Sequence, residues 1–114
     1  MLDKTRKLLI GEIEYSFKMV NRTIFKIDQK YGNYGTILDG IMNGKEFMTN
    51  AIKLLSCSCL EKEFDADELI DLLTPQQLSY EIPNFVTNLY FDYMGINDKT
   101  EKDTKKTKSK TEKN

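Results

Sequence analysis

The spacing of apolar side chains changes once along this chain, and that change sets the fold class. Between residues 13 and 19, apolar side chains occupy every second position, which is the period of a half-buried β-strand. Residues 8–10 supply a short partner strand, and Gly11-Glu12 lies where a tight turn would join the two. The sequence therefore predicts an N-terminal β-hairpin over about residues 7–19.

After the hairpin, apolar residues recur at every third or fourth position. That period is typical of amphipathic helices, so we expect a mainly α fold with a compact bundle of about four to six helices. Asn21 has the side chain of a helix N-cap, and Gly32 is a stop signal for the helix that would begin there. A short second helix is expected over residues 36–42, weakened by Gly40 and ended by Asn43-Gly44.

The helix expected over residues 45–60 is the most central by composition, because its apolar positions repeat over the whole segment. After it, Asp65 and Glu68 have the spacing of an N-terminal capping pair for another short helix. The polar side of the central helix is predicted to carry Lys45, Glu46, Asn50 and Lys53.

A stronger helix start follows in Thr74-Pro75-Gln76-Gln77. Thr74 can cap the helix, Pro75 suits its first position, and Gln77 can reach back to the amide of the cap. Pro83 lacks an amide hydrogen and clashes with the preceding turn. We therefore expect a kink or a short break near Ile82, then a second segment that continues through Asp92 and stops at Gly95.

Charge is unevenly distributed along the chain. Residues 1–96 carry 10 Lys and Arg against 14 Asp and Glu, whereas residues 97–114 carry 7 Lys against 4 acids and no apolar residue. A segment without apolar residues cannot offset the entropy lost on ordering. We expect a single domain over residues 1–96 and a disordered Lys-rich tail over residues 97–114. The tail acts either as a solvated spacer or as a contact for nucleic acid or an acidic protein surface.

Composition also points to a compartment. No apolar run reaches the roughly 18–20 residues of a membrane span, and residues 8–10 are too few for the core of a signal peptide. Cys57 and Cys59 are too few and too close together for a disulfide framework. The sequence predicts a cytoplasmic protein with no membrane partner. Its acidic body argues against nucleic acid as the main ligand, because duplex binding depends on neutralising phosphates.

Few residues are candidates for catalysis or for binding a metal or a phosphate. The chain has no His, which removes the commonest general base and metal ligand. Cys57 and Cys59 lack the further ligands of a zinc site and suit core positions better. The acids between Asp65 and Asp71 lack the mid-loop Gly of an EF-hand, and helix capping explains them. Gly32 and Gly35 have no Lys-Ser/Thr after them, so a turn is favoured over a phosphate loop. We predict no enzyme activity, no cofactor and no metal.

One aromatic segment is harder to explain as core alone. Residues 89–94 are apolar or aromatic except for Asp92, and six consecutive residues surround a helix completely. Part of this surface is therefore either covered on two sides or exposed, and exposed aromatic and Met side chains suit a protein interface. Complete burial is the alternative. The candidate protein-binding residues are Leu89, Tyr90, Phe91, Tyr93 and Met94.

Several segments taken together indicate a family. They are the predicted hairpin, residues 23–28, Lys30-Tyr31-Gly32, residues 50–59, Leu73-Thr74-Pro75 and residues 89–95. In this combination the chain resembles the small tail assembly chaperones of tailed bacteriophages and of prophages in Gram-positive hosts. The resemblance covers roughly residues 7–96.

The resemblance implies a mainly helical protein that acts in the cytoplasm of the bacterial host and is absent from the mature virion. It implies that the protein binds the tape measure protein, keeps it soluble and helps to recruit tail tube subunits during tail assembly. It also implies that a longer form can arise by ribosomal frameshifting, and it supplies no catalytic residues. A domain this small would also gain stability by forming a homo-oligomer.

A hypothesis from another class is a small nucleic-acid-binding regulator encoded by a mobile element. It requires a basic recognition helix. The helix over residues 45–60 carries only Lys45 and Lys53 against Glu46, so the sequence favours the chaperone.

Overall fold

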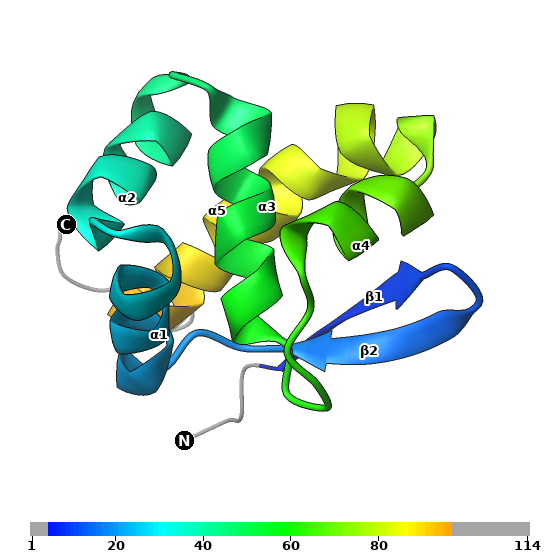
Figure 1. The fold of residues 1–114 in the computed structure, drawn as a ribbon, viewed down its shortest axis with the longest axis horizontal. Coiled ribbons are helices and arrows are strands. Elements are labelled where there is room, and N and C mark those ends of the chain that lie inside the picture. Colours follow the sequence, from blue (N-terminus) through cyan, green and yellow to red (C-terminus); the bar gives the residue numbers. More distant parts are fainter. Residues whose placement is uncertain (1–4, 97–114) are drawn as a thin grey trace, which may run out of the picture.

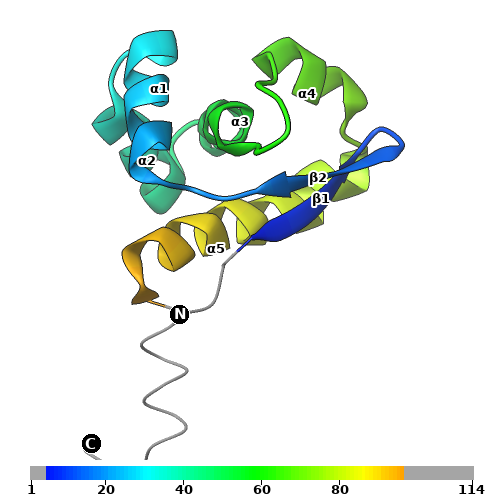
Figure 2. The same cartoon turned by 90° about the horizontal axis from the view of Figure 1, so that it is seen from below.

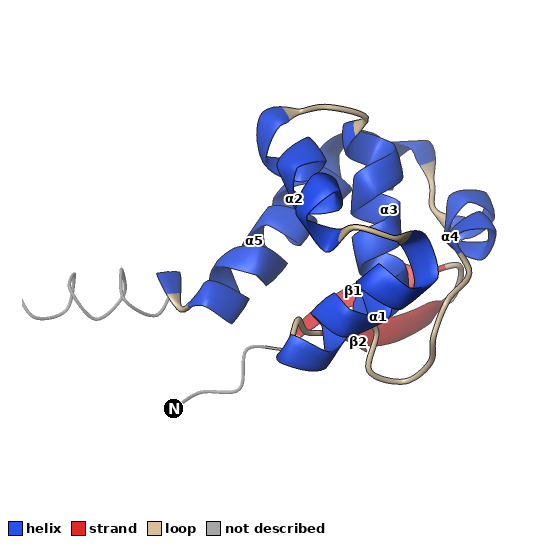
Figure 3. Cartoon of the chain, turned by 60° about the vertical axis from the view of Figure 1, so that its left-hand side comes forward, coloured by secondary structure: helices blue, strands red, loops and turns tan. Residues whose placement is uncertain are grey.

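The computed structural model describes residues 5–96, which form a two-stranded hairpin followed by five α-helices (Figure 1). A π-helical turn, η1, leads into the last helix. The expected mainly α fold with an N-terminal hairpin is confirmed, and Figure 3 shows strand only in that hairpin. The elements are β1 (Arg6–Ile10), β2 (Ile13–Phe17), α1 (Asn21–Tyr31), α2 (Tyr34–Asn43), α3 (Phe47–Ser58), α4 (Ala66–Leu72), η1 (Gln77–Glu81) and α5 (Ile82–Met94).

Strands β1 and β2 are antiparallel, and their register runs from Arg6 opposite Phe17 to Ile10 opposite Ile13. The two-residue turn is the predicted one, and Gly11 takes a φ of 66° there, a value that favours glycine. The outer edge of β2 continues the ladder with the segment after α3, because the Leu60 amide donates to the Ser16 carbonyl at 2.8 Å. The hairpin is thus attached to the end of the central helix.

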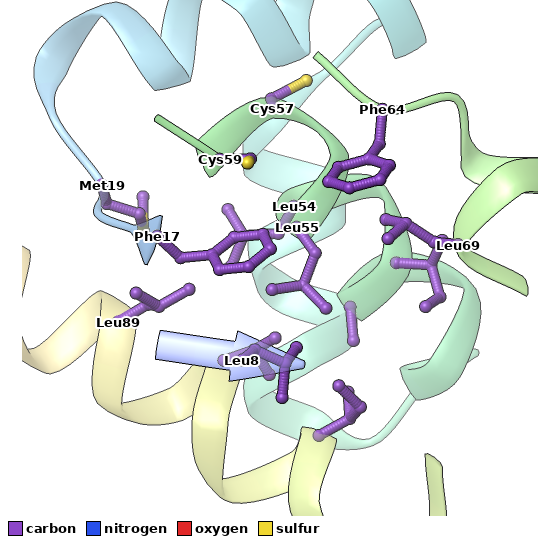
Figure 4. Packing of buried hydrophobic residues seen from close by; sticks show 14 of the residues in the cluster. Leu8, Phe17, Met19, Leu54, Leu55, Cys57, Cys59, Phe64, Leu69 and Leu89 are labelled. Carbon is purple, nitrogen blue, oxygen red and sulfur yellow. The ribbon is translucent and has the colours of Figure 1, made fainter. Parts of the chain in front are cut away.

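Helix α3 is the centre of the domain, as its composition predicted. It contacts α1, α2, α4 and α5, and Figure 2 shows it between α1 and α2 on one side and α4 on the other, with the hairpin lying between this row and α5. Phe17 of β2 is fully buried among Leu54, Leu55 and Leu89 (Figure 4). Its ring meets that of Phe85 edge to face, with centroids 5.6 Å apart.

One predicted helix cap is wrong, and a second is confirmed in part. Val20, not Asn21, is the N-cap of α1; its amide donates to the hydroxyl of Thr23 at 3.0 Å, and Asn21 is the first helical residue. Asp65 does occupy the N-cap position of α4 but makes no side-chain capping bond. The Glu68 carboxylate pairs with Lys62 at 2.8 Å and also accepts a hydrogen bond from the backbone of Asp65, as a capping pair requires. Asn21 has the chemistry of a cap, but its side chain accepts a hydrogen bond from Tyr93 of α5.

The capping box at Thr74 is confirmed. The Thr74 amide donates to Oε1 of Gln77 at 3.0 Å, and the Gln77 amide donates to the Thr74 hydroxyl at 3.1 Å. The expected kink near Ile82 takes the form of η1: the Ile82 amide donates to the carbonyl of Gln77, five residues earlier. This wider turn places Pro83 in the first turn of α5, where a missing amide hydrogen costs little.

Asn50 does not have its predicted role, and Gly40 has a packing role that the sequence did not predict. Asn50 was assigned to the polar side of its helix, yet it is buried, and its Nδ2 donates to the Lys45 carbonyl at 2.9 Å. Gly40 is also buried. A β-carbon on Gly40 would lie 2.0 Å from Asn50 Nδ2 and 2.6 Å from the Lys45 carbonyl oxygen. Gly40 therefore allows α2 to approach the start of α3 closely, which is a stabilising role.

Replacing Gly40 with alanine is expected to lower the free energy of unfolding by about 1–3 kcal/mol, the usual cost of an overpacked contact. Chemical denaturation monitored by circular dichroism measures the change. Gly35→Ala, in the same helix, is the matched control, because a β-carbon there would meet only Asn33 Oδ1 at 3.1 Å. Equal stability of the two variants would contradict a packing role for Gly40.

Two remaining expectations concern the C-terminal tail and membrane-spanning helices. The predicted disordered tail, residues 97–114, lies outside the described residues. Across residues 5–96, none of the helices has the length and apolar character needed to cross a membrane.

Candidate protein-binding surface

The five candidate binding residues on α5 have different environments. Leu89 is fully buried in the core, so it cannot contact a partner in this conformation. Tyr90 and Tyr93 are half-buried against the core, and Phe91 is half-buried with its ring tilted over that of Tyr90. Met94 alone is well exposed, at 53%. The helix therefore offers a partner Met94 and one side of the three aromatic rings.

Two contacts hold this part of α5 to the N-terminal elements. Nε and Nη2 of Arg6 donate to the two carboxylate oxygens of Asp92 at 2.6 and 3.1 Å. Such paired bonds are among the stronger polar contacts in proteins. The hydroxyl of Tyr93 donates to Oδ1 of Asn21 at the start of α1. Residues 92 and 93 are thus engaged in holding the domain together.

Tyr90 and Tyr93 lie near Tyr34, which is at the start of α2. Burial, with smaller contributions from the nearby Tyr90 and Tyr93, raises the pKa of Tyr34 to about 12. Tyr34 therefore remains a neutral phenol over the whole physiological range. All three tyrosines pack against the hydrophobic core, and we assign them a structural role.

Both cysteines are buried free thiols, as expected for core positions. Burial raises the pKa of the Cys57 thiol and that of the Cys59 thiol. Since the thiolate is the reactive form, neither side chain is activated as a nucleophile. In residues 5–96 no three Cys, Asp or Glu side chains lie together in a way that could hold a metal ion.

A cavity of about 390 Å³ lies where the end of α1 meets α2 and the start of α3. Its lining includes Lys45 and Lys53 against Asp39 and Glu46, and Lys45 pairs with Asp39 at 3.6 Å. The opposite charges balance, so the lining does not select an ion of either sign. The ring of Tyr31 forms one wall, and Tyr31 shares a hydrogen bond of 2.8 Å with Ser56.

Sequence reasoning missed the most exposed apolar side chains. Tyr80 on η1 is 78% exposed, Phe25 on α1 62%, and Ile13 in the hairpin 58%. Ile13 follows the alternation of a buried strand, but it directly follows the turn, at the end of the hairpin (Figure 1). Phe25 lies outside the apolar face of α1, and the helical spacing of the sequence is enough to predict this position.

Comparisons of the chain with protein-family models, with curated proteins and with solved structures found no match.

Proposed function

We propose that this protein is a phage tail assembly chaperone that binds the tape measure protein, keeps it soluble and helps to recruit tail tube subunits during tail assembly. The observation that carries the proposal is the amount of large apolar side chain left on the surface of so small a domain. Twelve large hydrophobic residues are at least 36% exposed within residues 5–96. Exposed apolar side chains suit a binding surface where they lie together in one patch.

The chemistry of the partner follows from the same surface. Exposed Leu, Ile, Met and aromatic side chains bind another apolar surface without requiring a particular sequence. A long helical protein with apolar stripes, as a tape measure protein is expected to be, needs such cover before it assembles. The family resemblance over residues 7–96 supports this partner, since the mainly helical fold is the one that the resemblance implies.

The alternative, a nucleic-acid-binding regulator, draws less support. Helix α3, the candidate recognition helix, has eight buried residues and packs against four other helices. A helix covered in this way cannot enter a major groove. Any nucleic acid contact would have to use other elements.

The proposal is tested by expressing a fragment of the tape measure protein, from the genome that encodes this chain, alone and together with the chaperone. We expect the fragment to be insoluble alone, and soluble and retained on the tagged chaperone when both are present. The control is a fragment whose apolar stripe is replaced by serine. A native fragment that stays insoluble, or that is not retained, contradicts the proposed function.

A further inference from the structure

The cavity between α2 and α3 is lined by polar groups that have no partner in the described part of the protein. It measures about 390 Å³ and lies where the two helices run side by side (Figure 1). Pockets that bind small molecules begin at about 300 Å³, so this volume is sufficient for a ligand. None of the exposed large apolar residues of the segment 5–96 lines it. The cavity is therefore separate from the apolar side chains on which the proposed chaperone function depends.

The side-chain amide of Asn50 is the most buried of these groups. Asn50 lines the cavity and is only 8% exposed. Its Nδ2 donates to the Lys45 carbonyl at 2.9 Å, which fixes the orientation of the amide, because only the nitrogen can donate. Oδ1 accepts no hydrogen bond from any residue between 5 and 96. Buried acceptors nearly always have a donor, so the donor to Oδ1 must come from within the cavity.

Charges of opposite sign lie on the two sides of Asn50. Lys53, about one turn further along α3, is half-buried, and Glu46 is the N-cap residue of the same helix. Both line the cavity, and neither has an ion pair with another described residue. The remaining charged residues of the lining, Asp39 and Lys45, pair with each other. One acid and one base are thus available to a ligand.

The backbone of Glu46 has an unusual conformation. With a φ of 47°, it is the one residue other than glycine that has a positive φ within 5–96. This region of φ favours glycine, because a β-carbon is strained there. Strained residues cluster at sites that bind ligands. Here the strained residue supplies the carboxylate at one end of the cavity.

The lining fits a molecule with an ammonium group at one end, a carboxylate at the other and a hydrogen-bond donor between them. Glu46 and Lys53 are seven residues apart, which is about 10 Å along a helix. An extended peptide of three residues spans about the same length, and its free termini carry these two charges.

We propose that this cavity binds a short zwitterionic peptide of about three residues. Its amino terminus lies at Glu46, a backbone amide donates to Oδ1 of Asn50, and its carboxylate lies at Lys53. The termini and the backbone carry the recognition, so the site does not require particular side chains of the peptide.

The probe is triglycine, which has the two charges and the backbone amides but no side chains. Amide chemical shifts of the isotope-labelled protein should show saturable binding with a dissociation constant of about 1 mM or less. The side-chain amide of Asn50 should be among the signals that shift most. N-acetyl-triglycine and triglycine amide each lack one terminal charge, and each should bind at least about tenfold more weakly. Added salt should also weaken binding.

Two variants test the charged ends of the cavity. Glu46→Gln and Lys53→Met each remove one charge while keeping most of the side-chain length, and each should weaken triglycine binding about tenfold. Glu12→Gln and Lys7→Met make the same changes at exposed positions of the hairpin, outside the cavity lining. These matched controls should leave the affinity unchanged, and thermal melting of each variant separates lost binding from lost folding.

The absence of saturable shifts at about 10 mM triglycine would overturn the proposed site. Equal binding of triglycine and its two capped forms would overturn the proposed class of ligand. Equal losses in the hairpin controls and in the cavity variants would overturn the proposed location. None of these results bears on retention of the tape measure fragment, so the proposed function is tested independently.

Discussion

Replacing Phe17 with alanine is expected to lower the free energy of unfolding by about 3–5 kcal/mol, because the change removes a fully buried ring and leaves a cavity. Phe17 packs between the hairpin, α3 and α5 (Figure 4), and its ring contacts Phe85 edge to face. Small domains are stable by only about 5–15 kcal/mol. Denaturant unfolding, followed by far-ultraviolet circular dichroism, should show a large fall in midpoint or a chain already partly unfolded.

Two variants test whether the loss comes from the cavity. Phe17→Leu keeps most of the volume and should cost clearly less than Phe17→Ala. Phe25→Ala removes the same ring from an exposed position on α1, and surface changes of this kind are usually within about 0.5 kcal/mol. A loss at Phe25 as large as that at Phe17 would contradict the described core.

The second large effect is expected at Arg6. Asp92 has only 5% of its side chain exposed, and Arg6 holds both of its carboxylate oxygens. Arg6→Ala leaves that carboxylate buried without this guanidinium, which should cost on the order of 3 kcal/mol. Thermal unfolding at neutral pH and low salt measures the loss.

Removing the charge of the buried Asp92 carboxylate should recover part of the stability lost in Arg6→Ala. Asp92→Asn removes the buried charge, so the double variant Arg6→Ala/Asp92→Asn should be more stable than Arg6→Ala alone. Arg22→Ala, a change of the same type at an exposed position in the first turn of α1, is the matched control. If Arg6→Ala and Arg22→Ala have equal effects, the pair contributes little to folding.

The parts of the fold that depend on short-range patterns could be predicted from the sequence. Apolar alternation located the hairpin, and the Thr74 capping box located the start of the final helical segment. Predictions that depended on a single polar side chain failed more often. Asn21 has the chemistry of an N-cap, but Tyr93, 72 residues away, donates to its side chain. No local pattern contains that information.

For the candidate binding residues, too, short-range patterns were predictive and long-range contacts were not. Helical spacing correctly indicated that residues 89–94 could not all face the core, since Met94 is exposed and Leu89 is buried. Spacing could not show that Asp92 is held by Arg6 or that Tyr80 is exposed.

The pairing of Arg6 with Asp92 joins residues 86 positions apart, and this has a consequence for synthesis on the ribosome. Of the described elements, the hairpin emerges before the helices, and α5, which covers one side of it (Figure 2), emerges after the others. At about 5–20 residues per second, Asp92 is added about 4–17 s after Arg6. During that interval the nascent chain exposes Leu8 and Phe17, both buried in the finished domain. Folding of this domain can therefore be completed only after α5 has left the ribosome.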